Sequence, residues 1–307
     1  MKGVVILPKY LSNHWPPKQG SDFSSVSSVT ASLFYGLQDS LGFDLRYADE
    51  VSVSSTTDVV IMFGVPYHNR PNMIPGLLDL DSSIKLVMYP GDIQSYGNPI
   101  CIENRLKVFS RSDLIISGSY EYFAEMYPQF LYKYKFLPLF FGPQERYVKL
   151  PFNYAPKMSC LLSGSINPSV YPLRSMLVKS RLAGLDYRSS TYAQGDAYAK
   201  LLNSYFCCVA TPSIFNYAVA KYFEIPAAGS LLLAPAVGDL KLAGFIANKH
   251  YIPVTKEDVI EKISHCLKSP EEYDCIRRGG MNFVREKHSV ISRVNQVKIL
   301  LEEMFDR

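Results

Sequence analysis

The chain has 307 residues, of which 48% are hydrophobic and 20% are charged, a composition typical of globular proteins with substantial cores. The net charge of +4 is spread along the sequence, and the densest basic cluster is only Lys133 with Lys135. This excludes the basic stripe or tail of a typical nucleic-acid-binding protein. A mild positive balance suits an anionic small molecule or an anionic membrane surface equally well.

The compartment is expected to be the cytoplasm. The N-terminal apolar run GVVIL is too short for a signal peptide, and the six cysteines lack the spacing of metal ligands, so we expect buried free thiols. Residues 201–220 carry no charge, but Asn203, Pro212 and Asn216 interrupt them. We therefore expect no membrane span there.

The first half alternates between apolar strands and helical segments. Helical spacing is seen at 26–41 and again at 120–126. Strands are predicted at 3–7, 44–48, 58–63, 85–89, 114–117 and 135–139. This alternation indicates a parallel sheet covered on both faces.

The second half repeats the alternation after a proline-containing linker at 140–156. Strands are predicted at 158–163, 185–188, 205–210 and 230–234, and helices at 171–182, 197–202, 216–223, 256–267, 270–286 and 289–305. The fold class is therefore α/β, with two Rossmann-like doubly wound domains facing a cleft. We expect the domains to be 1–145 and 146–290, followed by a terminal helix at 291–307. In such sheets, ligands bind at the carboxyl ends of the strands.

Two strand ends carry candidates for anion binding. Gly164-Ser165 follows the strand MSCLLS, so a phosphate could approach the backbone there, and Arg174 on the next helix could pair with a diphosphate. Ser213 follows strand YFCCVA and is expected to cap a helix that carries Lys221 near its end. Each feature also has an ordinary structural explanation, as a strand-end glycine, a solvated arginine or a helix cap.

The segment KYFEIPAAGSLLLAP places Glu224 among apolar residues. An i,i+3 salt bridge with Lys221 would explain it simply. The functional alternative is that its carboxylate accepts hydrogen bonds from both hydroxyls of a ribose. The small-residue turn that ends at Gly229 would let a ligand approach the backbone.

The first half offers two candidates for the general base, His68 after strand DVVIMF and Asp92 after strand KLVMY. Both could equally be solvated loop residues. Asp79-Leu80-Asp81 fits the D-x-D pattern of metal-dependent glycosyltransferases, but three residues match easily by chance, so we expect no metal site.

The second half resembles the donor-binding domain of GT-B glycosyltransferases, particularly the CgeB-like and group 1 families. The segments that carry the resemblance are LLSGSINPSVYPLR, LLNSYFCCVA, AKYFEIPAAGSLLLA, LAGFIANKHYIPV and EKHSVISRV. It implies that Glu224 binds the nucleotide ribose and that Arg174 and Lys221 bind the diphosphate. Many retaining members place a second glutamate where this chain has Asn216, which leaves the stereochemistry open.

The resemblance implies a metal-independent hexosyl- or pentosyltransferase that uses a nucleotide-diphosphate sugar as donor and no further cofactor. The N-terminal domain would present a glycan, glycoconjugate or other hydroxyl acceptor, and the terminal helix would cross back onto that domain. Two alternatives remain open: a sugar-nucleotide epimerase of the same two-domain plan, and a non-catalytic two-lobed nucleotide- or small-molecule-binding protein.

Overall fold

The computed structural model describes residues 1–8, 27–64, 72–94 and 97–306. These residues form two compact units. With the gaps left out, the first unit contains 1–8, 30–137 and 293–306, and the second contains 27–29 and 138–292. No helix in the described part of the chain is long and apolar enough to cross a membrane.

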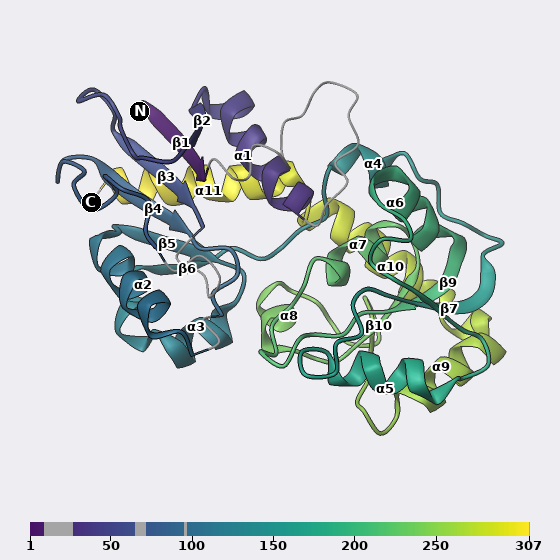
Figure 1. Cartoon of the computed structure of the whole chain (residues 1–307). Helices are drawn as coiled ribbons and strands as arrows, with labels where there is room; N and C mark the ends of the chain where they lie inside the picture. The colour runs from purple at the N-terminus through teal and green to yellow at the C-terminus, as the bar shows by residue number, and fades with distance from the viewer. Residues whose placement is uncertain (9–26, 65–71, 95–96, 307) are drawn as a thin grey trace. The chain divides into compact units, whose positions relative to one another are not determined.

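The first unit is built on a six-stranded parallel sheet with the order β2-β1-β3-β4-β5-β6 (Figure 1). Five of the six strands follow the predicted ranges closely, and the sixth begins one residue earlier and ends three residues earlier than predicted. The strands are β1 (Gly3–Pro8), β2 (Asp44–Ala48), β3 (Val59–Phe63), β4 (Lys85–Tyr89), β5 (Leu114–Ser117) and β6 (Tyr134–Phe136).

The helices of this unit cover both faces of the sheet, as right-handed crossovers require. Figure 1 shows α2 and α3 together on one face and α1 on the other. Their bounds are α1 (Ser27–Leu41), α2 (Pro99–Arg111) and α3 (Tyr120–Met126), with the short 3₁₀ helix η2 at Pro128–Lys133. Helix α2 was not predicted from the sequence, although Asn98 caps the N–H of Cys101 at its start and Pro99 stands at its first position.

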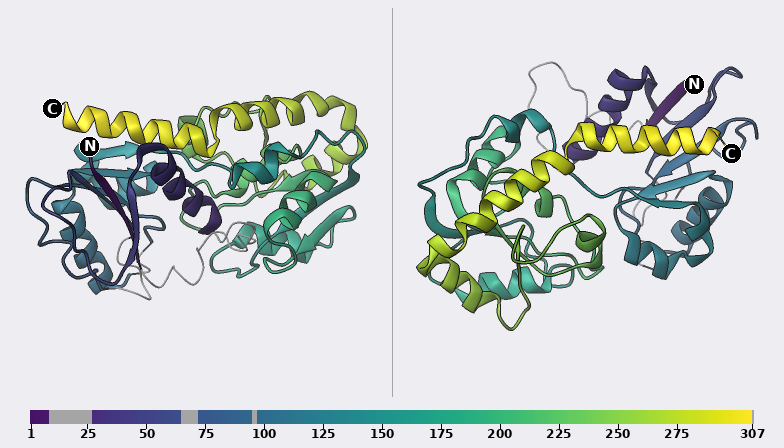
Figure 2. Two further views of the ribbon diagram at one scale, coloured as in Figure 1. Left: turned by 90° about the horizontal axis from the view of Figure 1, so that it is seen from above. Right: turned by 180° about the vertical axis from the view of Figure 1, so that it is seen from behind.

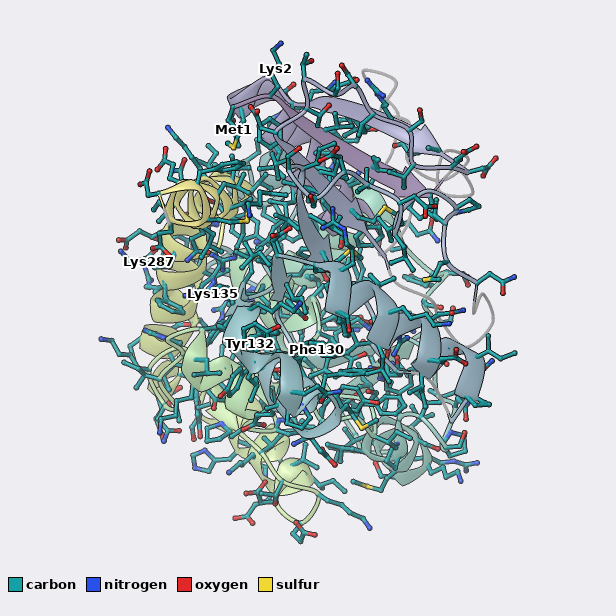
Figure 3. All side chains as sticks on the ribbon, turned by 90° about the vertical axis from the view of Figure 1, so that its left-hand side faces the viewer. Met1, Lys2, Phe130, Tyr132, Lys135 and Lys287 are labelled. Atoms are coloured by element: carbon teal, nitrogen blue, oxygen red, sulfur yellow. The ribbon has the colours of Figure 1, made fainter. Side chains whose placement is uncertain are left out.

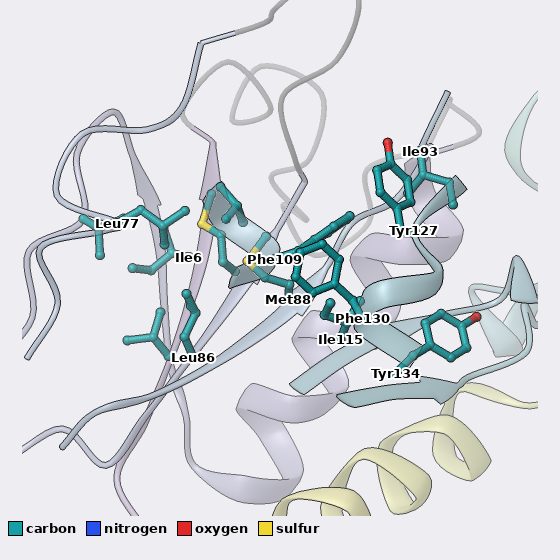
Figure 4. Close-up of a cluster of buried hydrophobic side chains, with 14 of the residues drawn as sticks. Ile6, Leu77, Leu86, Met88, Ile93, Phe109, Ile115, Tyr127, Phe130 and Tyr134 are labelled. Atoms are coloured by element: carbon teal, nitrogen blue, oxygen red, sulfur yellow. The ribbon is translucent and has the colours of Figure 1, made fainter. Parts of the chain in front are cut away.

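The core between the sheet and helices α2 and α3 is rich in aromatic rings (Figure 4). Phe109 lies at its centre, with ring centroids 5.1 Å from Tyr127, 5.5 Å from Phe123 and 5.8 Å from Phe130. The abundant aromatics thus fill the core of this unit.

The basic cluster noted in the sequence lies at the junction of η2 and β6 (Figure 3). Lys133 is 8% exposed, and its ammonium donates to the carbonyls of Ser110 and Ser112. That charge therefore ties the end of α2 to η2 and adds little to the surface potential.

The second unit has a five-stranded parallel sheet with the order β11-β10-β9-β7-β8. Four strands were predicted, and the two-residue strand β11 was missed. The strands are β7 (Lys157–Ser163), β8 (Leu185–Arg188), β9 (Tyr205–Val209), β10 (Leu231–Ala234) and β11 (Ile252–Pro253). Two separate sheets agree with the predicted pair of doubly wound α/β units.

Helices flank this sheet, and buried side chains of α5 and α9 form one continuous core with β7, β9 and β10. Helix α10 packs against α7 and β10, and α11 follows it in the chain (Figure 2), with its residues from Arg293 onward belonging to the first unit. The bounds are α4 (Gln144–Val148), α5 (Pro172–Ser180), α6 (Gly195–Ser204), α7 (Lys221–Ala227), α8 (Gly238–Leu242), α9 (Val259–Lys268), η3 (Pro270–Glu272), α10 (Asp274–Lys287) and α11 (Val290–Phe305).

Candidate functional site

Gly164 stands at the carboxyl end of β7, an inner strand of the second sheet, and marks the site. Its φ is +118°, and a Cβ added there would lie 2.6 Å from both Arg174 Nη1 and Lys221 Nζ. A side chain would therefore be strained and would displace both cations. The structure thus brings together three of the residues that the sequence singled out for a diphosphate.

Arg174 is buried, with only 4% of its surface exposed, and several contacts hold its guanidinium in place. Its Nε donates to Thr211 Oγ1 at 3.1 Å, and its Nη1 donates to the carbonyl of Ser165 at 2.8 Å. The guanidinium also stacks on Tyr171, 4.1 Å from the ring centroid. Burial lowers the pKa of Arg174. The sequence analysis did not identify Thr211 as a partner, although it lies in the segment Thr211-Pro212-Ser213 considered there.

Lys221 is the second cation of the site. Its ammonium donates to the carbonyl of Ser163, the last residue of β7. Burial and the nearby charge of Arg174 lower the pKa of Lys221 to about 7, and Glu224 only partly offsets this. A ligand anion at Gly164 would relieve the repulsion between the two cations and restore the charge of Lys221.

Glu224 lies in the first turn of α7, three residues after Lys221. Burial raises its pKa to about 7, and Lys221, a hydrogen bond from Tyr147 and the charge of Arg146 act in the opposite direction. The ion pairs within 4.0 Å in the described residues do not include Lys221 with Glu224. A simple i,i+3 salt bridge therefore does not account for this carboxylate.

Two tyrosines from other helices complete the surroundings of Glu224. Tyr147 on α4 is 2% exposed, and burial together with the nearby charge of Glu224 raises the pKa of its hydroxyl. Tyr198 on α6 has its hydroxyl 3.2 Å from Ser163 Oγ and interacts electrostatically with Glu224. Neither tyrosine was predicted. Tyr147 lies in the proline-containing linker, where no local pattern indicates that it approaches α7.

The expected helix start at Ser213 is wrong. Residues 211–220 form a loop, and α7 begins at Lys221, so both Lys221 and Glu224 lie at its start and not near its end. The physical reason is that Asn216 has a φ of +53°, which lies outside the right-handed helical region. Ser213 is buried and its Oγ accepts from the N–H of Phe215, so it closes a local turn of this loop.

Three further residues were predicted to bind the donor, and the structure does not bring all of them to the carboxyl end of β7 near Gly164. They are Ser165, Asn216 and Gly229. Ser165 is exposed and contributes its carbonyl to Arg174, whereas Asn216 is exposed in the 211–220 loop. Gly229 precedes β10 and packs against Met281, where a Cβ would lie 3.2 Å from its sulfur. Because β7 and β10 run in parallel with β9, Gly229 lies at the amino edge of the sheet, opposite to Gly164.

The candidates in the first unit are less well defined. Asp92 is exposed and follows β4 at its carboxyl end, as predicted. His68 lies outside the described residues. Asp81 of the D-x-D pattern accepts from the N–H and the hydroxyl of Ser83 at 2.8 and 2.7 Å, which is the geometry of a local turn.

Comparison with known proteins supports the resemblance. Residues 164–298 match the family model described as Glycosyl transferase-like. That range begins at Gly164 and includes Arg174, Lys221 and Glu224. No curated protein matches the chain.

Solved structures share the fold across both units. HepE from Anabaena, in complex with UDP, has a TM-score of 0.60 at 10% identity, over 99% of this chain and 100% of that one. Sucrose-phosphate synthase from Thermosynechococcus elongatus has a TM-score of 0.56 at 11% identity, over 95% of this chain and 81% of that one. A protein assigned as a UDP-N-acetylglucosamine 2-epimerase from Listeria monocytogenes has a TM-score of 0.53 at 9% identity, over 99% of this chain and 96% of that one. The chain has the GT-B fold of two Rossmann-like domains, and its residues 164–298 are similar to the glycosyl transferase-like family.

Proposed function

We propose that the protein transfers a sugar from a nucleotide-diphosphate donor to an acceptor hydroxyl. The observation that carries this proposal is the convergence of Arg174 and Lys221 on Gly164, with the Glu224 carboxylate one helical turn from Lys221. Two cations suit a diphosphate, and a neighbouring carboxylate suits the hydroxyls of a ribose. A nucleoside diphosphate contains both a diphosphate and a ribose.

The chemistry follows from where charge develops. As the bond between the anomeric carbon and the diphosphate breaks, negative charge grows on the leaving oxygen, and Arg174 and Lys221 would stabilise it there. The acceptor oxygen bonds to the anomeric carbon and loses its proton to a base. Asp92, at the end of β4, is the proposed base among the described residues, and His68 is the other candidate.

These two cations would take the role that a metal ion has in other transferases, and we propose that the reaction is metal-independent. The proposal predicts that activity persists in EDTA. The sugar would be a hexose or a pentose and the acceptor a glycan, a glycoconjugate or another hydroxyl compound.

Thermal stabilisation by a panel of nucleotides and nucleotide sugars tests donor binding. UDP is the first probe because HepE binds it. A ligand at a hundred times its Kd should stabilise the protein by about 2.7 kcal/mol, which is visible as a melting shift. Arg174→Met and Lys221→Met should each reduce that shift. If no nucleotide stabilises the protein, the proposal fails.

An epimerase remains a second candidate because the Listeria protein assigned that activity shares the fold. The two reactions differ in what happens without an acceptor. An epimerase converts the nucleotide sugar into its epimer, whereas a transferase leaves it unchanged until an acceptor hydroxyl is added. Separation of the donor from its epimer by chromatography therefore distinguishes the two.

A further inference from the structure

Three successive backbone carbonyls at the carboxyl end of β7 each accept a hydrogen bond from a different side chain. The donors to the carbonyls of residues 163, 164 and 165 are, in that order, Lys221 Nζ, the Tyr187 hydroxyl and Arg174 Nη1. The second and third of these hydrogen bonds are both 2.8 Å long. Two of the donors are the cations of the proposed diphosphate site, whereas Tyr187 is an uncharged side chain to which the proposed function assigns no role.

Strand β8 holds both backbone polar groups of Gly164. The N–H of Gly164 donates to the carbonyl of Arg188 at 3.1 Å, and its carbonyl accepts from the hydroxyl of Tyr187. Tyr187 and Arg188 are the last two residues of β8, which pairs in parallel with β7. The half-buried ring of Tyr187 packs against the core of this unit, so its hydroxyl is held in place.

The orientation of the peptide between Gly164 and Ser165 depends on the hydrogen bond from Tyr187. Gly164 has a φ of +118° and, without a Cβ, meets little steric resistance to rotation of its backbone. In a trans peptide the carbonyl and the N–H that follows it point in opposite directions. With the Gly164 carbonyl held on Tyr187, the N–H of Ser165 therefore points away from Tyr187.

The N–H of Ser165 is available to a ligand. Ser165 is exposed, and among the residues that the structure describes its N–H donates no hydrogen bond. A backbone N–H beside two cations suits a phosphate oxygen. A carbonyl oxygen turned to the same place would repel that phosphate.

We infer that Tyr187 is a positioning residue for donor binding: its hydroxyl holds the Gly164 carbonyl away from the diphosphate, so that the N–H of Ser165 faces it. This inference rests on the proposed function and adds a backbone donor to the two cations. Loss of the Tyr187 hydroxyl should therefore weaken the binding of a nucleoside diphosphate and spare the binding of the nucleoside. A merely structural role would weaken both alike.

Titration of UDP by calorimetry and of uridine by ligand-observed NMR, each into wild type and Tyr187→Phe, tests the inference. Phenylalanine keeps the ring in the core and removes only the hydroxyl. We expect the Kd for UDP to rise about tenfold, the scale of a lost hydrogen bond to a charged group. The Kd for uridine should stay at its wild-type value. An equal loss for both ligands, or an unchanged Kd for UDP, would overturn the role of Tyr187.

Tyr205→Phe is the matched control. Tyr205 belongs to the same sheet and is 4% exposed, and its hydroxyl donates to the Asp186 carboxylate at 2.8 Å. It stands at the amino end of β9, at the edge of the sheet opposite to Gly164. This variant should bind both UDP and uridine like wild type.

Ser165→Pro removes the N–H itself and tests the route by which Tyr187 acts. It should also raise the Kd for UDP, and Tyr187→Phe should add nothing in that background because the donor that it orients is gone. If Ser165→Pro binds UDP like wild type, or if the two losses add, the inference is overturned. This cycle needs only UDP, so it also applies if uridine binds too weakly for its Kd to be measured.

Arg174→Met separates failure of this inference from failure of the proposed function. If wild type does not bind UDP, or if Arg174→Met binds it as tightly as wild type, the proposed diphosphate site fails. If Arg174→Met weakens UDP binding but Tyr187→Phe does not, only the role of Tyr187 is overturned.

Discussion

Arg174 Nη1 and Lys221 Nζ both lie 2.6 Å from the position that a Cβ on Gly164 would take. The two residues come from α5 and α7, which follow different strands of one parallel sheet. Burial, and after it the nearby charge of Arg174, lowers the pKa of Lys221 to about 7. A bound anion would therefore stabilise this arrangement.

Replacement of Gly164 should damage the site directly. In Gly164→Ala the Cβ would displace both cations and force a non-glycine residue into a φ of +118°. We expect UDP affinity to fall about tenfold or more, with a loss of stability of about 1–3 kcal/mol. Gly184→Ala is the control, since it has a φ of +82° and its Cβ would meet Leu267. It should lose stability without losing affinity. Equal affinity in Gly164→Ala would contradict the prediction.

Binding of UDP should take up a proton at about pH 8. Because the pKa of Lys221 is about 7, its amine is mostly neutral at that pH, and a bound diphosphate would raise the pKa and restore the proton. Binding heats measured in buffers of different ionisation enthalpy report this uptake. Lys221→Met should abolish it, and Lys268→Met, exposed at the end of α9, should not. Unchanged uptake in Lys221→Met would show that another group titrates.

The buried Arg277 should be the main anchor of the segment before β7. It donates to Asp274 at 2.7 Å and to the carbonyls of Asn153 and Gly229 at 3.1 Å. We expect Arg277→Met to lower the free energy of unfolding by about 2–4 kcal/mol, because these carbonyls and the carboxylate lose a charged donor. Arg278→Met, the exposed neighbour on the same helix, should have a much smaller effect in urea denaturation. Similar losses in both variants would show that Arg277 is not the anchor.

The general base is tested by separating turnover from donor binding. Asp92→Asn removes proton transfer and leaves the second unit intact, so turnover should fall about a hundredfold or more while UDP affinity stays constant. Asp79→Asn is the control in the same unit and should keep full turnover. If Asp92→Asn keeps its turnover, His68 becomes the remaining candidate.

The sequence predicted the strands well because each is an uninterrupted apolar run, as in GVVIL and MSCLLS. It also selected Gly164, Arg174 and Lys221 correctly as residues that would meet, because the carboxyl ends of parallel strands lie at one edge. The helix predicted at 216–223 failed because the left-handed Asn216 delays its start to Lys221. Ser213 has the residue type of a helix N-cap, but its side chain closes a turn within the 211–220 loop.

The contact of α4 with α7 could not be predicted from the sequence. Arg285, which lies 138 residues from Tyr147, donates to the carbonyls of Tyr147 and of Ala227 and so links the two helices. No periodicity or spacing encodes such a long-range arrangement. Gly229 was assigned to the donor site because of the small residues around it, but that turn serves the packing of α7 against α10.

Calorimetric titration of UDP into wild type and Glu224→Ala tests the central claim most directly. If the carboxylate holds the ribose, the variant should bind UDP about 10- to 150-fold more weakly, which corresponds to roughly 1.5–3 kcal/mol for hydrogen bonds to a charged acceptor. Its folding should be largely retained, and Glu261→Ala, exposed on α9, should bind like wild type. Equal affinities of wild type and Glu224→Ala would contradict the assignment of this site to a nucleotide donor.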